Sequence, residues 1–193
     1  MNNKLQGLTT NYLGRQYEFL NIIDSTQTEI WRRIENKTIE NGALIMANIQ
    51  TNGKGTHGRI WHTDENNNIA FSIYVKTNNK INLFDGLTFE IAKTIVGIFK
   101  NQYNINIEIK SPNDLMINNK KIGGILTESR IKSDFMKCLV IGIGINTNKL
   151  NFSKDIENIA TSIKKEYKID VNRFEFVTEF CNVFENVLNE RIK

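Results

Sequence analysis

Glycines and positive charges gather in one short stretch of this chain, residues 48–61. The residues there that could do chemistry are Gly53, Lys54, Gly55, Gly58, Arg59 and Trp61. Glycine lets backbone N–H groups come close to a ligand, and the two cations bring positive charge to the same place. The stretch therefore predicts a loop that wraps an anion, either a phosphate or a carboxylate. A glycine-rich hairpin loop with solvated charges is the alternative.

The glycine spacing also suggests two kinds of nucleotide-binding loop, but the surrounding sequence excludes both. Residues 53–58 match G-x-G-x-x-G, which in dinucleotide-binding folds opens a helix. Here a turn-forming stretch, residues 59–68, follows the glycines and leads into a strand. A P-loop needs Ser or Thr after its Gly-Lys pair, whereas Lys54 is followed by Gly55.

Two further motifs place ligand-binding side chains on later turns and strands. Asn113 and Asp114 follow the only proline, and an Asp beside an Asn can hold Mg²⁺ through oxygen ligands. An ordinary Pro-Asn-Asp turn is the alternative. Lys121 precedes Gly123 and Gly124, and adjacent glycines in a strand make sense where a ligand or another backbone approaches closely. The alternative there is a glycine bulge beside a solvated lysine turn.

A fourth motif, residues 142–146, alternates glycine with isoleucine and ends at Asn146. In a strand this alternation puts the bulky side chains on one face and leaves the other face flat, which suits a planar ligand. The Asn146 amide offers a donor and an acceptor, so it could read an adenine edge. A strand packed closely under a helix is the alternative.

The elements that must position these motifs are strands and helices in alternation. Apolar periodicity predicts strands at residues 17–23, 43–49, 68–76, 105–110, 115–117, 122–128 and 135–146. It predicts helices at residues 26–35, 83–103, 156–167 and 172–192, the first with its cap at residues 24–26. Residues 118–121 form a hairpin turn. Helices segregated between hairpin-linked strands indicate an α+β domain with a mixed, mainly antiparallel sheet.

Composition limits the class of protein. The chain has 193 residues, 40% of them hydrophobic, and a net charge of +4, which fits one globular domain. Its lysines alternate with acidic residues, which argues against a nucleic-acid-binding protein. Cys138 and Cys181 lie in apolar runs and are expected to be buried free thiols. Two histidines cannot build a His/Cys metal cluster, and the lack of an apolar leader predicts a cytoplasmic location.

Taken in order, the motifs resemble the catalytic domain of biotin protein ligases. The resemblance rests on Asp24-Ser25-Thr26, Gln50 with the loop at residues 53–61, Pro112–Leu115, Lys121–Glu128 and Gly142–Asn146. It implies an α+β fold of the biotin–lipoate ligase type, similar to class II aminoacyl-tRNA synthetases. It also implies a single catalytic domain over residues 1–193, without a DNA-binding helix-turn-helix domain and without a C-terminal small barrel domain.

The resemblance implies an ATP-dependent, Mg²⁺-dependent ligase that activates biotin as biotinyl-5′-AMP. The biotin would then pass to a lysine on the biotin carboxyl carrier domain of a carboxylase. No nucleic acid and no membrane is implied as a partner, and a homodimer is left open. Lys121, Arg59 and Lys54 would act as catalytic cations, because attack of a carboxylate on the α-phosphorus brings two anions together.

A larger set of residues would bind the substrates. Ser25, Thr26 and Gln50 would meet the ring of biotin, and Trp61 and Asn146 would serve the adenine side. The full implied binding set is Ser25, Thr26, Gln27, Gln50, Gly53, Lys54, Gly55, Thr56, Gly58, Arg59, Trp61, Asn113, Lys121, Gly123, Gly124 and Asn146, with Asp114 on the metal.

Three positions depart from the family pattern. The family loop usually reads Gly-Arg-Gly-Arg, where this chain has Lys54 and Thr56. Lys54 keeps a charge but loses the fork of an arginine, and Thr56 loses the charge altogether. Ser111 stands where the family usually has a tryptophan. The resemblance therefore predicts weaker retention of the activated intermediate, with release of free biotinyl-adenylate.

Two other functions compete with biotin ligation. A lipoate–protein ligase or octanoyl transferase shares the fold, but the Arg-Arg-x-x-Gly-Gly-Gly motif of those families is absent from this sequence. A degenerate, non-catalytic biotin- or nucleotide-binding protein is the other alternative. Release of pyrophosphate in the presence of biotin, ATP and Mg²⁺ separates a ligase from a binding protein.

Overall fold

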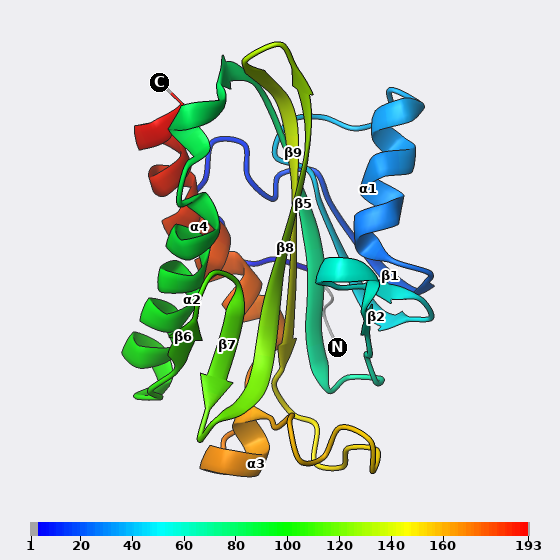
Figure 1. Cartoon of the computed structure of the whole chain (residues 1–193), viewed down its shortest axis with the longest axis vertical. Helices are drawn as coiled ribbons and strands as arrows, with labels where there is room; N and C mark the ends of the chain where they lie inside the picture. Colours follow the sequence, from blue (N-terminus) through cyan, green and yellow to red (C-terminus); the bar gives the residue numbers. More distant parts are fainter. Residues whose placement is uncertain (1–3, 193) are drawn as a thin grey trace.

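A seven-stranded sheet forms the centre of the computed structural model, which describes residues 4–192 (Figure 1). The strand order is β1-β2-β5-β9-β8-β7-β6. β1 and β2 pair in parallel, and every other neighbouring pair is antiparallel. The strands are β1 (Tyr17–Ile23), β2 (Leu44–Gln50), β5 (Asn68–Lys80), β6 (Glu108–Lys110), β7 (Asp114–Ile117), β8 (Lys120–Lys132) and β9 (Phe135–Asn146).

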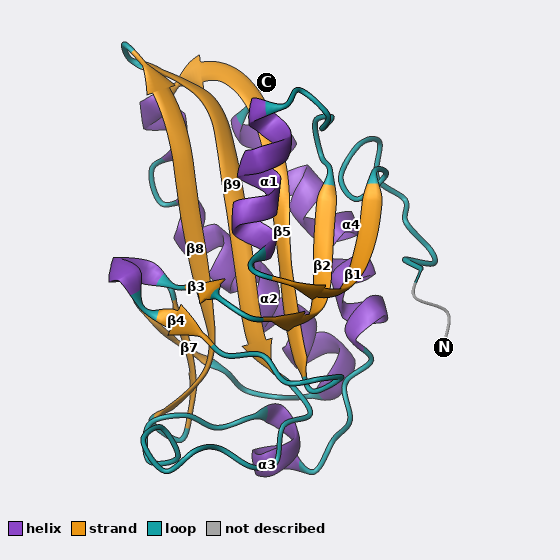
Figure 2. Cartoon of the chain, turned by 90° about the vertical axis from the view of Figure 1, so that its right-hand side faces the viewer, coloured by secondary structure: helices purple, strands orange, loops and turns teal. Residues whose placement is uncertain are grey.

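Helices cover the two faces of the sheet unequally. α2 (Leu87–Tyr103) and α4 (Arg173–Arg191) lie together on one face, and α1 (Thr26–Glu35) lies on the other (Figures 1 and 2). A short helix, α3 (Ile163–Tyr167), follows the long connection after β9. None of the helices among residues 4–192 combines the length and the apolarity needed to cross a lipid bilayer.

The alternation of residues along β5 and β9 separates a core face from a site face. Ile69, Phe71 and Ile73 of β5 are fully buried in the large core beneath α2 and α4. Because neighbouring strand residues point to opposite faces, Ser72 points to the α1 side. Gly142 pairs with Ser72 in the register and leaves space on that same side. The sequence alternation therefore produces a hollow beneath α1.

α4 is hydrogen-bonded to residues 11–13, near the start of the described chain. The Glu185 carboxylate of α4 accepts backbone N–H bonds from Asn11, Tyr12 and Leu13, at 2.6, 3.0 and 2.9 Å. Burial raises the pKa of Glu185, but these backbone N–H donors stabilise the ionised form, outweigh burial and lower the pKa. The loop at residues 11–13 is thus fixed to the opposite end of the sequence.

The fold class predicted from the sequence is confirmed, and several boundaries are corrected. The helix predicted at residues 156–167 contains only α3, because the segment before it turns and Ala160 forms a parallel bridge with Lys121. The helix predicted from residue 83 begins at Leu87, after a 3-10 turn at Ile81–Phe84. The predicted 105–110 strand is confined to β6. The turn predicted at residues 118–121 is narrower, because Asn118 and Asn119 alone take positive φ there.

Candidate functional site

Two adjoining hollows lie beside α1 and the glycine-containing strands. The inner cavity has a volume of about 50 Å³ and is lined by the half-buried Gln50 and by buried polar residues that include Ser25, Thr26, Gln27 and Ser72. The outer cleft has a volume of about 390 Å³ and is lined by residues that include Arg59, Lys110, Asp114, Asn146, Lys149 and Phe152. Four residues line both hollows: Gly55, Thr56, Trp61 and Lys121.

The start of α1 forms one wall of the inner cavity. Ser25 is the N-cap of the helix, and its hydroxyl accepts a hydrogen bond from the Thr28 N–H at 3.4 Å. Next to it, the Thr26 N–H donates to Gln50 Oε1 at 2.8 Å, which joins α1 to the end of β2. The first turn of α1 therefore holds two buried side chains against the cavity.

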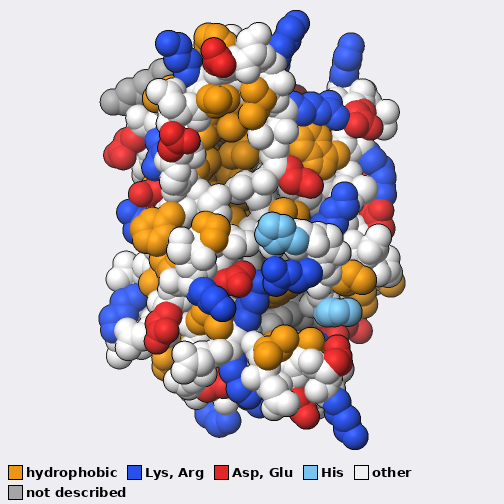
Figure 3. Space-filling model, in the orientation of Figure 1, with side chains coloured by type: hydrophobic (Ala, Val, Ile, Leu, Met, Phe, Trp, Pro, Cys, Tyr) orange, Lys and Arg blue, Asp and Glu red, His pale blue; other side chains and the backbone are white. Residues whose placement is uncertain are grey.

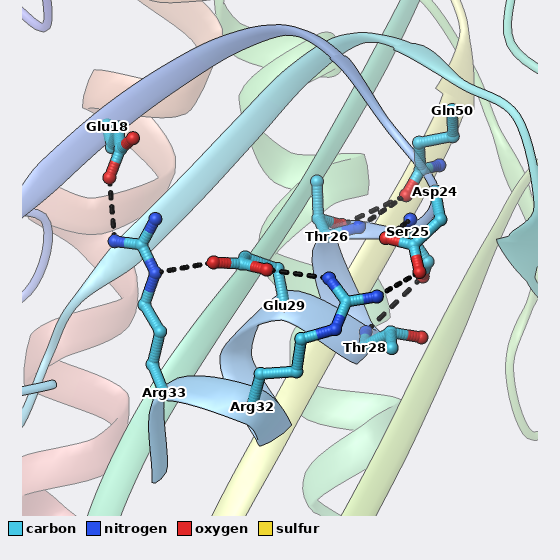
Figure 4. A network of polar contacts seen from close by, with 9 residues as sticks. All are labelled: Glu18, Asp24, Ser25, Thr26, Thr28, Glu29, Arg32, Arg33 and Gln50. Atoms are coloured by element: carbon cyan, nitrogen blue, oxygen red, sulfur yellow. Dashed lines mark hydrogen bonds and ion pairs between the residues drawn. The ribbon is translucent and has the colours of Figure 1, made fainter. Parts of the chain in front are cut away.

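A ladder of ion pairs holds this first turn from the solvent side (Figure 4). Arg32 bridges Asp24 and Glu29, and Arg33 bridges Glu29 and Glu18. Burial raises the pKa of Asp24, but the Arg32 guanidinium and the Ser25 N–H outweigh it and lower the pKa. The Arg32 and Asp24 side chains are 43% and 38% exposed, so water screens their attraction.

Inside the molecule the same turn continues into a chain of hydrogen bonds between neutral side chains that ends at the Glu128 carboxylate. Thr26 Oγ1 lies 2.9 Å from Ser72 Oγ, and Ser72 Oγ donates to Gln27 Oε1 at 3.0 Å. Gln27 Nε2 in turn donates to Glu128 Oε2 at 3.0 Å. Thr26, Gln27 and Ser72 are each 3% exposed or less. The chain of hydrogen bonds joins α1 and β5 and ends at the half-buried Glu128 of β8.

Glycines in β9 make room for the side chains that fill the site. A Cβ atom at Gly142 would lie 2.6 Å from Gln27 Oε1, and one at Gly144 would lie under 3.0 Å from the Trp61 ring. The flat face predicted for β9 is therefore present, but Trp61 and Gln27 cover it. Because the Trp61 indole lines both hollows, it forms a partition between them.

The glycine-rich stretch predicted as a loop folds into a small two-stranded ribbon. β3 (Gly53–Lys54) pairs with β4 (Ile60–Trp61), and a 3-10 turn at Thr56–Gly58 joins them. His57 and Gly58 in this turn have φ values of 56° and 73°. The ribbon places Lys54 at the inner cavity and Arg59 at the outer cleft.

Lys121 stands at the junction of the two hollows. Its Nζ lies 2.6 Å from Asp114 Oδ1, and the two side chains are 29% and 23% exposed. Gly124 lies next to it, and a Cβ there would be in contact with Lys121 Nζ at 3.4 Å. The lysine can therefore reach a ligand in either hollow if it exchanges its carboxylate partner for that ligand.

The two asparagines of the predicted site are already engaged. Asn113 Nδ2 donates to the Ile125 carbonyl at 3.2 Å, beside the inner cavity. Asn146 Oδ1 accepts from Asn68 Nδ2 at 2.7 Å, and its Nδ2 donates to the Thr161 carbonyl at 3.1 Å. With both ends of the amide used, Asn146 shapes the outer cleft and has one N–H left for a ligand.

The buried Arg173 guanidinium is hydrogen-bonded to Asn68, the partner of Asn146, and to two further asparagines. Arg173 donates to Asn48 Oδ1 at 3.2 Å, to the Asn68 carbonyl at 3.1 Å and to Asn66 Oδ1 at 2.9 Å. Burial lowers the pKa of Arg173, which is 8% exposed. All three of these acceptors are neutral, so hydrogen bonds hold the guanidinium here.

Most of the predicted binding residues converge on the two hollows, and three do not. Gly53, Gly58 and Gly123 line neither hollow. A Cβ at Gly53 would meet the Trp61 carbonyl, and one at Gly123 would meet the Gly144 carbonyl at 2.9 Å, so both glycines permit backbone contacts. Gly58 supplies a positive φ in the turn.

Sequence reasoning assigned no role to several residues at the site. Ser72 was hidden in the apolar run of β5, where a polar residue among buried ones was the available signal. Glu128 stood at the end of a motif without a role. Lys149 and Phe152 of the outer cleft lie in the connection after β9, which was predicted only as the approach to a helix. Lys149 is 8% exposed and pairs with Asp64 at 2.6 Å.

The residues present could take part in a magnesium site only with help from the ligand. Among residues 4–192 no group of three His, Cys, Asp or Glu side chains could hold a metal ion. Within the described part of the chain, Asp114 is the one carboxylate lining the outer cleft. Mg²⁺ commonly binds one or two carboxylates together with substrate phosphates, so Asp114 fits a magnesium ion that arrives with a nucleotide.

Comparisons with known proteins show the family to which this chain belongs. Residues 19–146, more than half of the chain, match the Biotin/lipoate A/B protein ligase family. The chain is 32% identical over 181 residues to the bifunctional ligase/repressor BirA of Bacillus spizizenii, which covers 93% of this chain and 55% of that protein. It is 24% identical to the human biotin–protein ligase, over 96% of this chain and 27% of that protein. The chain therefore spans about half or less of the length of these relatives.

A solved structure shows the same arrangement of elements. The biotin protein ligase from Aquifex aeolicus in complex with biotin and ATP superposes with a TM-score of 0.72 at 25% identity. The match covers 92% of this chain and 70% of that one. The family profile and the shared fold confirm the resemblance drawn from the sequence motifs. The chain belongs to the biotin/lipoate A/B protein ligase family.

Proposed function

We propose that this chain is an ATP-dependent biotin ligase, which activates biotin as biotinyl-5′-AMP and transfers it to a lysine of a carrier domain. One observation carries the proposal: a small polar cavity and a larger cleft adjoin, and Lys121 lies where they meet. The inner cavity offers hydrogen bonds to a neutral polar ring. The outer cleft offers room and charge for a nucleotide. The human biotin–protein ligase among the relatives and the Aquifex aeolicus biotin protein ligase among the solved structures support the choice of biotin.

The first step joins two anions, so positive charge at the junction is its main requirement. A biotin carboxylate oxygen attacks the α-phosphorus of ATP, an oxygen–phosphorus bond forms, and pyrophosphate leaves. Lys121 neutralises charge on the carboxylate and the α-phosphate, while Lys54 and Arg59 act from the ribbon side. No acid or base is needed for this exchange, and positioning supplies much of the rate.

In the second step the neutral amine of the carrier lysine attacks the acyl carbon of biotinyl-5′-AMP. An amide bond forms, AMP leaves, and the amine loses a proton to solvent. The ring held in the inner cavity keeps the acyl carbon at the boundary of the outer cleft, where a carrier can approach. The carrier domain as partner, a homodimer and a cytoplasmic location stay predictions, as does a single catalytic domain over residues 1–193.

Mg²⁺ belongs to this proposal as a companion of ATP. Asp114 would hold it together with the phosphates, and the metal would neutralise their charge. Binding in this way would free Lys121 from Asp114. Competition between the lysine and the metal for one carboxylate is thus built into the site.

The charge pattern of the surface agrees with a small-molecule site. On the face seen in Figure 3, Lys and Arg side chains are interspersed with Asp and Glu side chains. A nucleic-acid-binding surface would gather its cations into a patch or stripe. For the described residues, the face seen in Figure 3 shows no such single stripe of cations.

Mass spectrometry tests the proposal directly. The protein is incubated with ATP, Mg²⁺, an isolated biotin carboxyl carrier domain and either biotin or lipoate. We expect pyrophosphate release and the mass increase of one biotinyl group on the carrier lysine with biotin only. Transfer of lipoate instead would support the lipoate ligase alternative. Binding of biotin without pyrophosphate release would identify the degenerate binding protein.

A further inference from the structure

Glu128 of β8 does not line the inner cavity, but it is hydrogen-bonded to Gln27, which does. Its Oε2 accepts from Trp31 Nε1 at 2.7 Å and from Gln27 Nε2 at 3.0 Å. Gln27 Nε2 also donates to the Val140 carbonyl at 3.2 Å. Both amide hydrogens are therefore used, and the amide nitrogen must face the carboxylate because a carboxylate can only accept. This orientation forces Gln27 Oε1 toward Ser72.

The hydrogen-bond chain beyond Gln27 is one proton short. It contains three oxygen–oxygen contacts: Ser72 Oγ to Gln27 Oε1 at 3.0 Å, Thr26 Oγ1 to Ser72 Oγ at 2.9 Å, and Thr26 Oγ1 to Gln50 Oε1 at 3.1 Å. Only two hydroxyl protons serve them, one from Ser72 and one from Thr26. One of the three contacts must therefore lack a proton.

The contact without a proton is the one that faces the ligand. Gln27 Oε1 is buried and needs the Ser72 proton, since a buried acceptor left unsatisfied costs free energy. The Thr26 proton then goes to the fully buried Ser72 Oγ, because Gln50 Oε1 already has a backbone donor. Gln50 Oε1 still accepts from the Thr26 backbone N–H. Thr26 Oγ1 and Gln50 Oε1 remain as two neighbouring acceptors, and both residues line the inner cavity.

We propose that Glu128 is a positioning residue, which sets the direction of this hydrogen-bond chain so that the inner cavity presents paired acceptors to an N–H group of the substrate. The inference rests on the proposed function, under which that N–H belongs to the ureido ring of biotin. Glu128 acts through Gln27 and Ser72 and has no contact with the substrate.

Loss of the carboxylate would let the chain reverse. In Glu128→Leu only the longer contact to the Val140 carbonyl, at 3.2 Å, still holds the Gln27 nitrogen, so the amide turns its nitrogen toward Ser72 in part of the molecules. The Ser72 proton then moves to Thr26, the Thr26 proton moves to Gln50, and the paired acceptors are filled. Glu128→Gln keeps the direction, because one oxygen atom takes both hydrogen bonds in the native protein.

Calorimetric titration of biotin into the full chain tests the inference. We expect Glu128→Leu and Ser72→Ala each to weaken biotin binding about tenfold, the loss typical of one buried hydrogen bond. Glu128→Gln should stay within about threefold of the native protein, because a neutral acceptor replaces a charged one. The double variant should bind no more weakly than Ser72→Ala, since both changes break one chain. The KM for ATP should not change in any of them.

Glu35→Leu is the matched control. Glu35 also joins α1 to β8, through an ion pair with Arg130 at 2.8 Å, but that contact does not reach the cavity. We expect native biotin affinity in this variant.

The possible results separate the inference from the proposed function. If the native protein fails to bind biotin, the proposed function is wrong and the inference falls with it. If the native protein binds biotin and Glu128→Leu binds it equally well, only the inference is overturned. Equal loss of biotin and ATP binding in Glu128→Leu would also overturn it. If Glu128→Leu does not fold, native biotin affinity in Ser72→Ala overturns it instead.

Discussion

The inner cavity and the outer cleft meet at Lys121 but are lined by different kinds of side chain. The inner cavity is lined in part by buried hydroxyls and amides that are hydrogen-bonded to one another, with paired acceptors left for a ligand. The outer cleft carries cations on a short ribbon and on a strand edge, and Arg59 and Lys110 there are exposed. The first hollow is ordered before a ligand binds, whereas the second must gather its charges around one.

The difference shows where each kind of binding energy is stored. Buried neutral groups lose little conformational entropy on binding, because folding has already fixed them. Exposed long side chains lose more, and water and salt screen their charges. We therefore expect substitutions in the inner cavity to act on one substrate in a salt-independent way. Substitutions in the outer cleft should act on the nucleotide and vary with salt.

Lys121→Met should cause the largest loss of activity, because Lys121 lines both hollows. Removal of a preorganised charge from the reacting atoms typically costs about 100-fold or more in kcat. We expect that loss in pyrophosphate release. Lys120→Met is the control, since Lys120 bonds the Glu157 carbonyl and lines neither hollow. A native rate in Lys121→Met would show that the reaction does not take place at the junction.

Gly144→Ala should displace the Trp61 indole, which separates the two hollows. The new methyl group would displace the Trp61 ring, and overpacking of this kind typically costs about 1–3 kcal/mol. Because Trp61 borders both hollows, the KM values for biotin and ATP should both rise about tenfold. Gly97→Ala in α2 is the control, since a Cβ there meets nothing within 4 Å. A rise in only one KM would place Trp61 in a single hollow.

Thr56→Arg should add a positive charge at a residue that lines both hollows. A second cation near the phosphates should reduce release of free biotinyl-adenylate about threefold, as a modest charge-assisted bond would. The effect should shrink as salt is raised. Thr51→Arg adds the same charge at an exposed position away from both hollows. If both variants reduce release equally, net charge rather than position is responsible.

Asp24→Asn should have the smallest effect, because its ion pair with Arg32 is exposed. We expect a loss of at most about 1 kcal/mol in the free energy of unfolding at pH 7. The folded-state pKa of Asp24 is lowered from 3.8, so its contribution is present above that pH and is lost as the pH falls through the lowered value. Urea unfolding between pH 7 and pH 3 measures the difference. Asp134→Asn is the control, since Asp134 is exposed in the turn between β8 and β9. A difference that grows toward low pH would contradict the sign.

Local sequence patterns predicted most helices and strands and many of the residues that line the two hollows. They did not predict the side-chain contacts between those residues. The alternation at residues 142–146 indicated a strand with one open face, and the structure contains it as the end of β9. What covers that face depends on Trp61 and Gln27, which lie on other elements. Sequence spacing cannot show such contacts, because they depend on how distant segments pack.

The connection after β9 was harder to predict for a related reason. A helix was predicted at residues 156–167 from local periodicity, but the backbone at Lys121 and Ala160 pairs across the chain and limits the helix to α3. Long-range pairing therefore overrode local propensity. Ser72 and Glu128 escaped notice because their importance lies in proton direction, which only distances reveal.

The bonds from Glu185 to the loop at residues 11–13 have a consequence for the time course of folding. β5 can pair with β9 only after residue 146 has left the ribosome, and Glu185 emerges later still. Contacts between such distant parts of a chain slow folding, because a long loop must close first. We expect the nascent chain to stay open until α4 appears and then to fold in one late, cooperative step.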